Sequence, residues 1–273
     1  MKNLVVRTIT GAVFVAAIIT AAIWSPLSFA ALFFLVSAIS IWEYQHLLWP
    51  GSRVPGLWLP MASGLVIYTL MAYFALGWIG PEYLWMILPV IILHASILVF
   101  SVKEIALRRI AGDLSGIMFI VLPFALLNLY LNPAGIPEYH TAWLVLGMFI
   151  ILWTHDTFAY LSGSLFGKHP LYRGISPKKT WEGSIGGFGF SLVAAYIISI
   201  FSPELESFQW FIIALVIAIF GTIGDLAESL LKRRASVKDS GNLLPGHGGI
   251  LDRFDSVLFV SPIVLAIIII FSS

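Results

Sequence analysis

Long apolar runs dominate the pattern of hydrophobic and polar positions along this chain. Each run lacks Asp, Glu, Lys and Arg, and most match the roughly 20 residues that a helix needs to cross a bilayer. The first run is too long for one crossing, and it contains Trp24-Ser25-Pro26-Leu27-Ser28, which is typical of a tight turn. We therefore predict two helices in the first run and one in each of the others. The runs are residues 8–42, 54–81, 83–102, 114–137, 139–155, 183–203, 207–224 and 256–273.

The distribution of charge between the runs supports nine crossings. With the N-terminus in the cytoplasm, nine spans place all 15 Lys and Arg residues in cytoplasmic segments, as the positive-inside rule expects. The segments on the other side carry only Glu82, Glu138, Glu204 and Glu206. A single crossing over 8–42 would divide the cations between the two sides. The sequence thus predicts an all-α, polytopic integral membrane protein with about nine transmembrane helices and a cytoplasmic N-terminus.

Composition agrees with this picture and excludes several classes of function. The chain is 59% hydrophobic and 11% charged, whereas ordinary soluble domains are about 25% charged. A net charge of +1 argues against a nucleic-acid-binding protein. The chain has no cysteine, which excludes disulfides, thiol catalysis and thiolate metal sites. The first run is too long for a cleavable signal peptide.

The polar residues divide the chain into two regions. Residues 1–150 are mostly uncharged apolar spans joined by short loops, and we predict that they form a membrane scaffold that gives access to lipid. Residues 151–273 hold nearly all the polar residues that could do chemistry. We therefore predict that the second region is catalytic and that its site lies on the cytoplasmic face.

Two polar clusters precede the span at 183–203. His155 and Asp156 lie at the inner end of a span, where ionisable residues usually face the protein interior or a watery cavity. A helix-end aspartate paired with a loop cation is the structural alternative. Further along, Ser176-Pro177 is typical of a helix N-terminus with Ser176 as the N-cap. Lys178 and Lys179 would then lie in the first turn, where the helix dipole favours anions, so a bound phosphate would explain them. Attraction to anionic lipid headgroups is the alternative.

Three further clusters follow residue 224. If the helix of run 207–224 continues, it places four polar residues on one face, namely Asp225, Glu228, Ser229 and Lys232. Asp252 and Asp255 open the last span at i and i+3, and they repel each other unless a cation bridges them. A favourable interaction with the helix dipole is the structural alternative. The glycine-rich loop 238–249 permits backbone with positive φ and close approach to a ligand, but it lacks the spacing of a P-loop.

Taken together, these clusters predict a nucleoside triphosphate site. Mg²⁺ typically takes one or two carboxylates together with substrate phosphates, and cations neutralise the remaining phosphate charge. The candidate metal ligands at the inner membrane boundary are Asp156, Asp225, Asp252 and Asp255. The cations around them are Lys178, Lys179, Lys232, Arg233, Lys238 and Arg253.

These motifs also carry a resemblance to a known family. The stretch containing Ser229-Leu-Leu-Lys232-Arg233, Lys238-Asp239-Ser-Gly241 and Leu244-Pro245-Gly-His247-Gly248-Gly249-Ile250-Leu-Asp252-Arg253-Phe254-Asp255 resembles the signature of the phosphatidate cytidylyltransferase (CDP-diacylglycerol synthase) family. Asp156 and the segment from Ser176 to Gly183 are similar to an upstream block of the same family. The resemblance covers about residues 153–262.

The resemblance implies a reaction in phospholipid biosynthesis, in which CTP and phosphatidate give CDP-diacylglycerol and pyrophosphate with Mg²⁺. It implies a multi-pass protein of the inner or plasma membrane whose partners are CTP, phosphatidate and membrane lipid. A second cation and a homodimer are left open. The expected metal ligands are Asp225 and Asp252, with Asp255 and Asp156 as further ligands. The expected catalytic residues also include Lys232, Arg253 and His247, the last two facing the departing pyrophosphate. The expected substrate-binding residues are Lys178, Lys179, Ser229, Arg233, Lys238 and Asp239.

Two other functions remain open at this point. A related enzyme would activate a different lipid phosphate with the same headgroup chemistry. A transporter or channel would place ionisable residues near the bilayer midplane and often shows inverted repeats. Here the acidic residues lie at one boundary and the sequence shows no internal repeat, which favours the enzyme.

Overall fold

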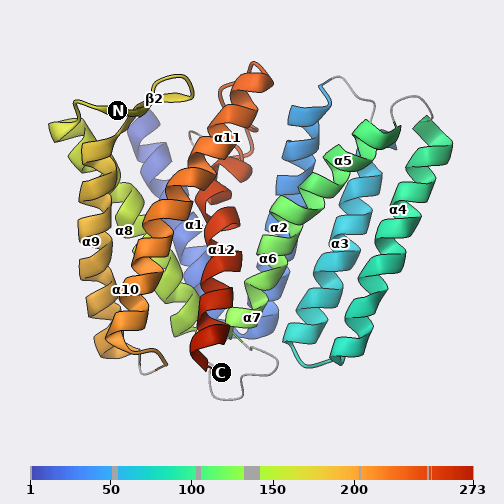
Figure 1. The fold of residues 1–273 in the computed structure, drawn as a ribbon, viewed down its shortest axis with the longest axis horizontal. Helices are drawn as coiled ribbons and strands as arrows, with labels where there is room; N and C mark the ends of the chain where they lie inside the picture. Colours follow the sequence, from blue (N-terminus) through green and yellow to red (C-terminus); the bar gives the residue numbers. More distant parts are fainter. Residues whose placement is uncertain are drawn as a thin grey trace. The chain divides into compact units, whose positions relative to one another are not determined.

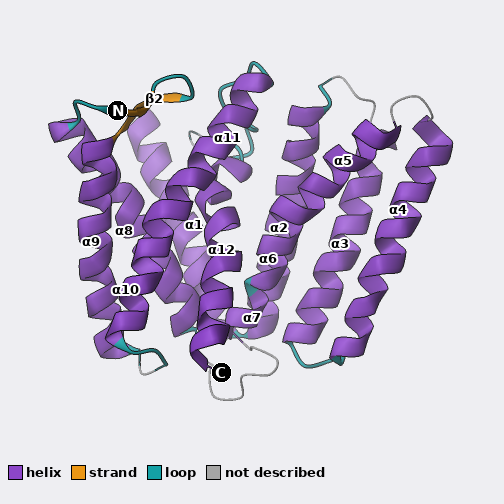
Figure 2. Ribbon diagram, viewed as in Figure 1, coloured by secondary structure: helices purple, strands orange, loops and turns teal. Residues whose placement is uncertain are grey.

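The computed structural model describes residues 2–50, 55–102, 106–131, 142–202, 204–244, 246 and 248–272. Figures 1 and 2 show that almost all of the described chain is helical. The chain forms two compact units. The first unit comprises Met1–His140 with Val237–Phe254, and the second comprises Thr141–Ser236 with Asp255–Ser273. The functional division predicted at residue 150 stays a prediction.

The first unit is built from helices. Its elements are α1 (Lys2–Trp24), α2 (Pro26–Leu48), α3 (Pro55–Ala75), the 3-10 helix η1 (Pro81–Met86), α4 (Ile87–Val102), α5 (Ala106–Gly116), the π-helical turn η3 (Ile117–Val121), α6 (Leu122–Leu126) and α7 (Asn128–Leu131). The segment from Val237 to Phe254 adds a loop and the first residues of α12 (Leu251–Ser272).

The second unit combines helices with one small hairpin. Its elements are α8 (Trp143–Phe166), β1 (Pro170–Tyr172), β2 (Ser176–Thr180), α9 (Trp181–Phe201), α10 (Ser207–Val216), the π-helical turn η4 (Ile217–Gly221), α11 (Thr222–Arg234) and the remainder of α12. Strands β1 and β2 pair in an antiparallel sheet, which Figure 1 shows at the same end of this unit as the C-terminal half of α11.

Eight helical stretches within the described residues are long and apolar enough to cross a membrane. A shorter apolar helix at Thr8–Trp24 lies within α1. The prediction of an all-α polytopic membrane protein is confirmed. The count of nine spans and the cytoplasmic N-terminus stay predictions.

The break predicted within the first apolar run is present. Helix α1 ends at Trp24, and α2 begins at Pro26 with Ser25 as its N-cap. The Ser25 hydroxyl accepts a hydrogen bond from the Ser28 N–H, and the Ser28 hydroxyl accepts one from the Ser25 N–H, both at 3.0 Å. This reciprocal capping satisfies donors that a helix start otherwise leaves without partners. Proline at the first helical position costs no hydrogen bond, which explains why the helix restarts there.

An aromatic cluster forms the core of the first unit near the start of α12. The rings of Phe33, Phe124 and Phe254 lie 5.2–5.8 Å apart between centroids. Phe29 lies 4.5 Å from Phe33, and Phe14 lies 5.1 Å from Phe254. These contacts join α1, α2, α6 and the first turn of α12, so they fix where the last helix of the chain begins.

Close backbone contact between α8 and α9 sets the framework of the second unit. A Cβ atom at Gly183 would lie 2.7 Å from the Ala159 carbonyl oxygen, and one at Gly187 would lie 2.7 Å from that of His155. Only glycine leaves room for this approach. The result is a closely packed pair of helices, of which α8 carries His155 and Asp156 and α9 begins directly after β2.

Candidate active site

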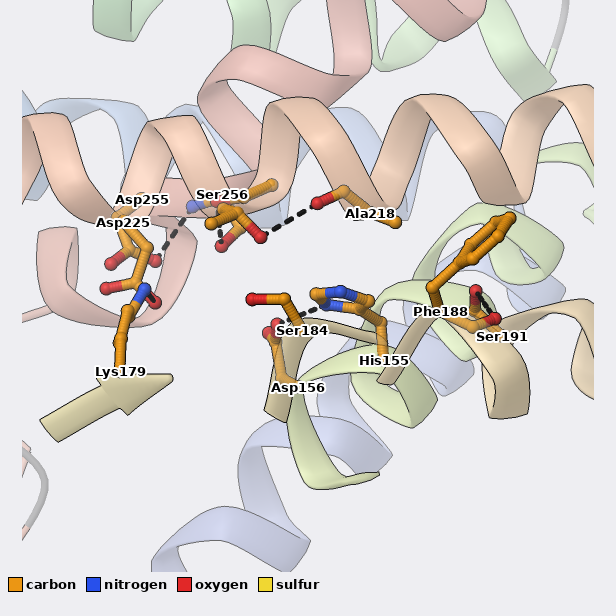
Figure 3. Close-up of polar contacts among 12 residues, drawn as sticks. His155, Asp156, Lys179, Ser184, Phe188, Ser191, Ala218, Asp225, Asp255 and Ser256 are labelled. Atoms are coloured by element: carbon orange, nitrogen blue, oxygen red, sulfur yellow. Dashed lines mark hydrogen bonds and ion pairs between the residues drawn. The ribbon is translucent and has the colours of Figure 1, made fainter. Parts of the chain in front are cut away.

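Polar side chains from four elements of the second unit gather at one place (Figure 3). Helix α8 contributes Asp156, strand β2 contributes Lys179, helix α11 contributes Asp225, and helix α12 contributes Asp255. In Figure 3 the side chains of Asp225 and Asp255 lie side by side, and that of Lys179 reaches toward Asp225. The predicted grouping of these residues is therefore present within this unit.

The segment at 176–180 is a strand, so the prediction of a helix starting at Ser176-Pro177 is wrong. The N-cap of α9 is Thr180, whose hydroxyl accepts a hydrogen bond from the Gly183 N–H at 3.2 Å. Residues 176–180 instead pair with Pro170–Tyr172. The two lysines therefore do not lie in a first helical turn, and the argument from the helix dipole does not apply to them.

The strand gives the two lysines different surroundings. Successive side chains of a strand point to opposite faces. Lys179 is half-buried and forms an ion pair with Asp225, whereas Lys178 is exposed. The structure thus brings Lys179 into the carboxylate cluster, and the role predicted for Lys178 stays a prediction.

Helix α11 carries the polar stripe that the sequence predicted. Lys232 Nζ lies 2.6 Å from Glu228 Oε2, one turn away, and both side chains are at most 15% exposed. Ser229 is half-buried and Arg233 is exposed on the same helix. The predicted continuation of the helix beyond the apolar run is confirmed, because α11 extends to Arg234.

Close packing of α11 against α12 places Asp225 beside Asp255. A Cβ atom at Gly224 would lie 2.5 Å from the Asp255 carbonyl oxygen and 3.0 Å from the Phe259 ring. The Ser256 hydroxyl donates a hydrogen bond to the Gly221 carbonyl oxygen at 3.1 Å, which joins the same two helices one turn earlier. The backbones therefore meet where each helix carries an aspartate.

Asp255 lies in a field of negative charge. Its Oδ1 atom accepts a hydrogen bond from the Ser256 N–H at 2.7 Å. Asp225, Glu228 and Asp156 all lie close enough to act on its charge. Four carboxylates thus share this region, and two of them, Asp225 and Glu228, are paired with Lys179 and Lys232.

Asp156 is the most exposed member of the group. Its side chain is 50% exposed, and its Oδ1 atom lies 3.2 Å from Nδ1 of the buried His155. Within the part of the chain that the structure describes, Asp156 contacts the preceding histidine and no loop cation pairs with it. Ser184 of α9 lies beside this pair in Figure 3.

A divalent cation fits this donor set only when a substrate completes it. Among the residues that the structure describes, no group of three or more His, Asp or Glu side chains is arranged to hold a metal ion by itself. Mg²⁺ commonly takes one or two carboxylates and completes its shell with water and substrate phosphates. Asp225 and Asp255 are two carboxylates of this kind, and Asp225 is paired with the Lys179 ammonium.

The glycine-rich loop belongs to the first unit, and two carboxylates hold it. Asp252 Oδ2 accepts hydrogen bonds from the N–H groups of Ser240 at 2.9 Å and Gly249 at 2.8 Å. Gly246 and Gly248 have φ of 75° and 83°, so two of the glycines adopt the positive φ that the sequence permits. The second carboxylate is Glu43 of α2, a residue that the sequence analysis did not select.

The remaining predicted residues are distributed as follows. Lys238, Asp239 and Arg253 are exposed in or next to the loop of the first unit. Asp252 is 8% exposed and belongs to the same unit. His247 lies outside the described residues. The catalytic, metal and substrate roles predicted for these residues stay predictions.

Glu43 is not among the residues predicted from the sequence, and Glu228 is predicted only as part of the polar face of its helix. A signal for Glu43 was available, because it is the charge that ends the first apolar run, and a charge next to a span usually has a specific partner.

Comparison with known proteins identifies similar chains. The protein is 47% identical over 126 residues to phosphatidate cytidylyltransferases from Staphylococcus saprophyticus and Staphylococcus haemolyticus, covering 46% of this chain and 48% of each relative. It is 46% identical over 127 residues to the phosphatidate cytidylyltransferase of Staphylococcus aureus strain COL, again covering 46% and 48%. The chain thus spans about half the length of the curated relatives it matches. The characteristic pattern of the cytidylyltransferase family matches residues 5–271, which is nearly the whole chain, so this protein belongs to the cytidylyltransferase family.

Proposed function

We propose that this protein transfers the CMP group of CTP to phosphatidate, giving CDP-diacylglycerol and pyrophosphate. An oxygen of the phosphatidate phosphate attacks the α-phosphorus of CTP, and the bond from that phosphorus to the oxygen bridging to the β-phosphate breaks. The pyrophosphate leaves with that oxygen. The attacking phosphate is already anionic at neutral pH, so the step needs no general base.

The observation that carries the proposal is the carboxylate pair Asp225 and Asp255 beside Lys179, with the Glu228–Lys232 pair further along α11. Two polyanionic substrates repel each other, so catalysis of this kind is mainly positioning and charge neutralisation. Asp225 and Asp255 would hold Mg²⁺, with Asp156 near them. When bound, that ion would neutralise charge that develops on the phosphates. The relatives named above share the proposed activity by name.

Lys179 and Lys232 would contact substrate phosphates directly. Each is paired with a carboxylate of the cluster, Lys179 with Asp225 and Lys232 with Glu228. These pairs hold the ammonium groups beside Asp225 and Glu228 before substrate arrives. A lysine is a compact point charge on a flexible stem, so it can turn from a carboxylate to a phosphate with little rearrangement.

The membrane setting suits a lipid substrate. The helices of the second unit carry exposed apolar residues such as Ile185, Val193 and Ile197 along α9. A lipid phosphate would keep its acyl chains among such residues while its headgroup reaches the carboxylate cluster. We propose that the protein lies in the cell membrane and that the cluster faces the cytoplasm, where CTP is available.

The proposal is tested with purified protein in mixed micelles containing phosphatidate and CTP labelled in the cytosine ring. The expected result is labelled lipid and an equal amount of pyrophosphate, both abolished by EDTA and restored by Mg²⁺. Asp255→Asn should lower the rate by about 10²-fold or more. Glu204→Gln removes a carboxylate of the same unit that is not part of the cluster, so it should not lower the rate.

The same assay separates the alternatives. Faster labelling of another lipid phosphate than of phosphatidate would change the acceptor and leave the headgroup chemistry in place. Lack of pyrophosphate release with every lipid phosphate would contradict the proposed reaction. Release in micelles, which have no second compartment, would exclude transport as the protein's only activity.

A further inference from the structure

A buried carboxylate of α2 holds the glycine-rich loop in place. Glu43 is 1% exposed, although it lies in a helix of mainly apolar residues. Its Oε1 atom accepts a hydrogen bond from the Ile250 N–H at 3.1 Å, and its Oε2 atom accepts one from the Leu251 N–H at 2.8 Å. The Ser240 hydroxyl donates a third to Oε2 at 3.1 Å. All of these residues belong to the first unit.

These hydrogen bonds give Glu43 a defined structural role. A buried charge is expensive unless donors surround it, so its presence points to a requirement. Ile250 and Leu251 lie at the start of α12, where backbone N–H groups have no partner within the helix. The partial positive charge of a helix N-terminus favours an anion there. Glu43 thus caps a helix that lies 207 residues later in the chain.

Asp252 is the second carboxylate that binds the loop. Its Oδ2 atom binds the N–H groups of Ser240 and Gly249, so Ser240 is held by both carboxylates. Gly241 and Gly249 fit against Glu43, because a Cβ atom at either position would overlap its carboxylate. Contact with the two carboxylates therefore explains why Ser240, Gly241 and Gly249 occupy their positions in the loop.

We propose that Glu43 is a positioning residue for the reaction, acting through the loop and the first turn of α12. The loop and that turn carry Lys238, Asp239 and Arg253, the residues predicted to meet substrate or pyrophosphate. This part rests on the proposed function. That Glu43 holds the loop rests on the contacts alone.

The substitution Glu43→Gln separates these statements. Glutamine keeps the size of the side chain but replaces one acceptor oxygen with an NH₂ group, which cannot accept from a backbone N–H. One of the two N–H groups at the start of α12 then loses its acceptor. Asp113→Asn is the matched control, because Asp113 is a fully buried carboxylate of the same unit and its ion pairs within the described residues are with Arg109 and His94.

The first measurement is amide hydrogen exchange of the purified full chain. We expect peptides covering residues 238–251 to exchange at least 10-fold faster in Glu43→Gln than in the wild type. Asp113→Asn should leave these peptides unchanged. If Glu43→Gln does not accumulate as folded protein, Ser240→Ala removes a single bond to Glu43 and should accelerate exchange in the same peptides. Unchanged exchange in the folded variant would overturn the anchoring role.

The second measurement is steady-state CTP turnover at equal amounts of folded protein. Small misplacements of catalytic groups cost up to about 10²-fold in rate. We expect kcat of Glu43→Gln to fall by about 10-fold to 10²-fold while KM for CTP changes less than threefold, because contacts to departing pyrophosphate form in the transition state. A purely structural role would lower the melting temperature, as in Asp113→Asn, with no loss of kcat per folded molecule.

The two measurements distinguish failure of this inference from failure of the proposed function. Faster loop exchange with unchanged kcat would overturn the positioning role. A wild-type protein without CTP turnover would contradict the proposed function, and the exchange result would still decide whether Glu43 holds the loop.

Discussion

Removing the Lys179 ammonium is expected to change metal affinity and nucleotide affinity in opposite directions. The ammonium forms an ion pair with Asp225, so it would compete with the proposed divalent cation for that carboxylate. Lys179→Met should therefore strengthen the binding of a metal ion alone. The same change removes one of the two lysines of the cluster and should weaken the binding of CTP.

The size of the effect follows from the exposure of the pair. Two unit charges about 4 Å apart interact by about 4 kcal/mol at an effective dielectric constant near 20 and by about 1 kcal/mol in water. The side chains of Lys179 and Asp225 are 27% and 34% exposed, so water screens part of the attraction. Fully exposed ion pairs contribute at most about 1 kcal/mol. Because this pair is only partly exposed, we expect its interaction to contribute about 1–2 kcal/mol. This corresponds to a change of about 5-fold to 30-fold in each affinity.

The purified protein is titrated with Mn²⁺ in the absence of nucleotide, and electron paramagnetic resonance measures how much of the ion is bound. The KM for CTP is measured separately. Lys178→Met is the control, because it removes the same charge from the exposed neighbouring residue of the strand. That control should leave the Mn²⁺ affinity within twofold of the wild type. Weaker Mn²⁺ binding by Lys179→Met would refute the view that ammonium and metal compete for Asp225.

Three further substitutions are tested by thermal unfolding in detergent. They alter the contact between α11 and α12, the Glu228–Lys232 pair and the Asp113–Arg109 pair. Gly224→Ala should destabilise by about 1–3 kcal/mol, because its Cβ overlaps the α12 backbone at Asp255. Lys232→Met should destabilise by about 3 kcal/mol, because it removes the cation from the buried Glu228. Asp113→Asn should destabilise by about 2 kcal/mol, because Arg109 Nε then loses a charged partner at 3.1 Å. Unchanged melting temperatures would contradict each of these contacts.

The helical plan could be predicted from the sequence because its signals are local. The apolar runs indicate where helices lie, and the turn predicted at Trp24–Ser28 marks the break, which the structure shows to be a capped helix start at Ser25. The stripe from Asp225 to Lys232 needed only the helical period, and Glu228 pairs with Lys232 as expected. In each case the residues that decide the structure lie within one or two turns of one another.

The start of α9 was predicted wrongly because two capping signals compete within five residues. Ser176-Pro177 has the composition of a helix start, but Thr180 is the residue that caps α9. The pairing of 176–180 with β1 settles the competition, since it uses backbone groups that a helix would need. Glu182 adds a further contact, since its carboxylate accepts hydrogen bonds from the Lys168 and His169 N–H groups at 3.2 Å.

The partners of Glu43 could not be predicted from spacing. Its three donors lie 197–208 positions away, and nothing in the local sequence around α2 indicates them. Asp252 shows the same limit, because its position beside Asp255 suggested a shared metal ion whereas one of its oxygens binds two loop amides. The bonds from distant backbone amides depend on the fold, so the local sequence does not indicate them.

The central claim is that the aspartates where α11 meets α12 support CMP transfer to a lipid phosphate. It is tested most directly by the rate of label transfer from CTP to phosphatidate, compared between wild type and Asp225→Asn at saturating CTP and Mg²⁺. The account predicts a loss of about 10²-fold to 10³-fold, with folding retained. A rate within twofold of the wild type in Asp225→Asn would contradict it.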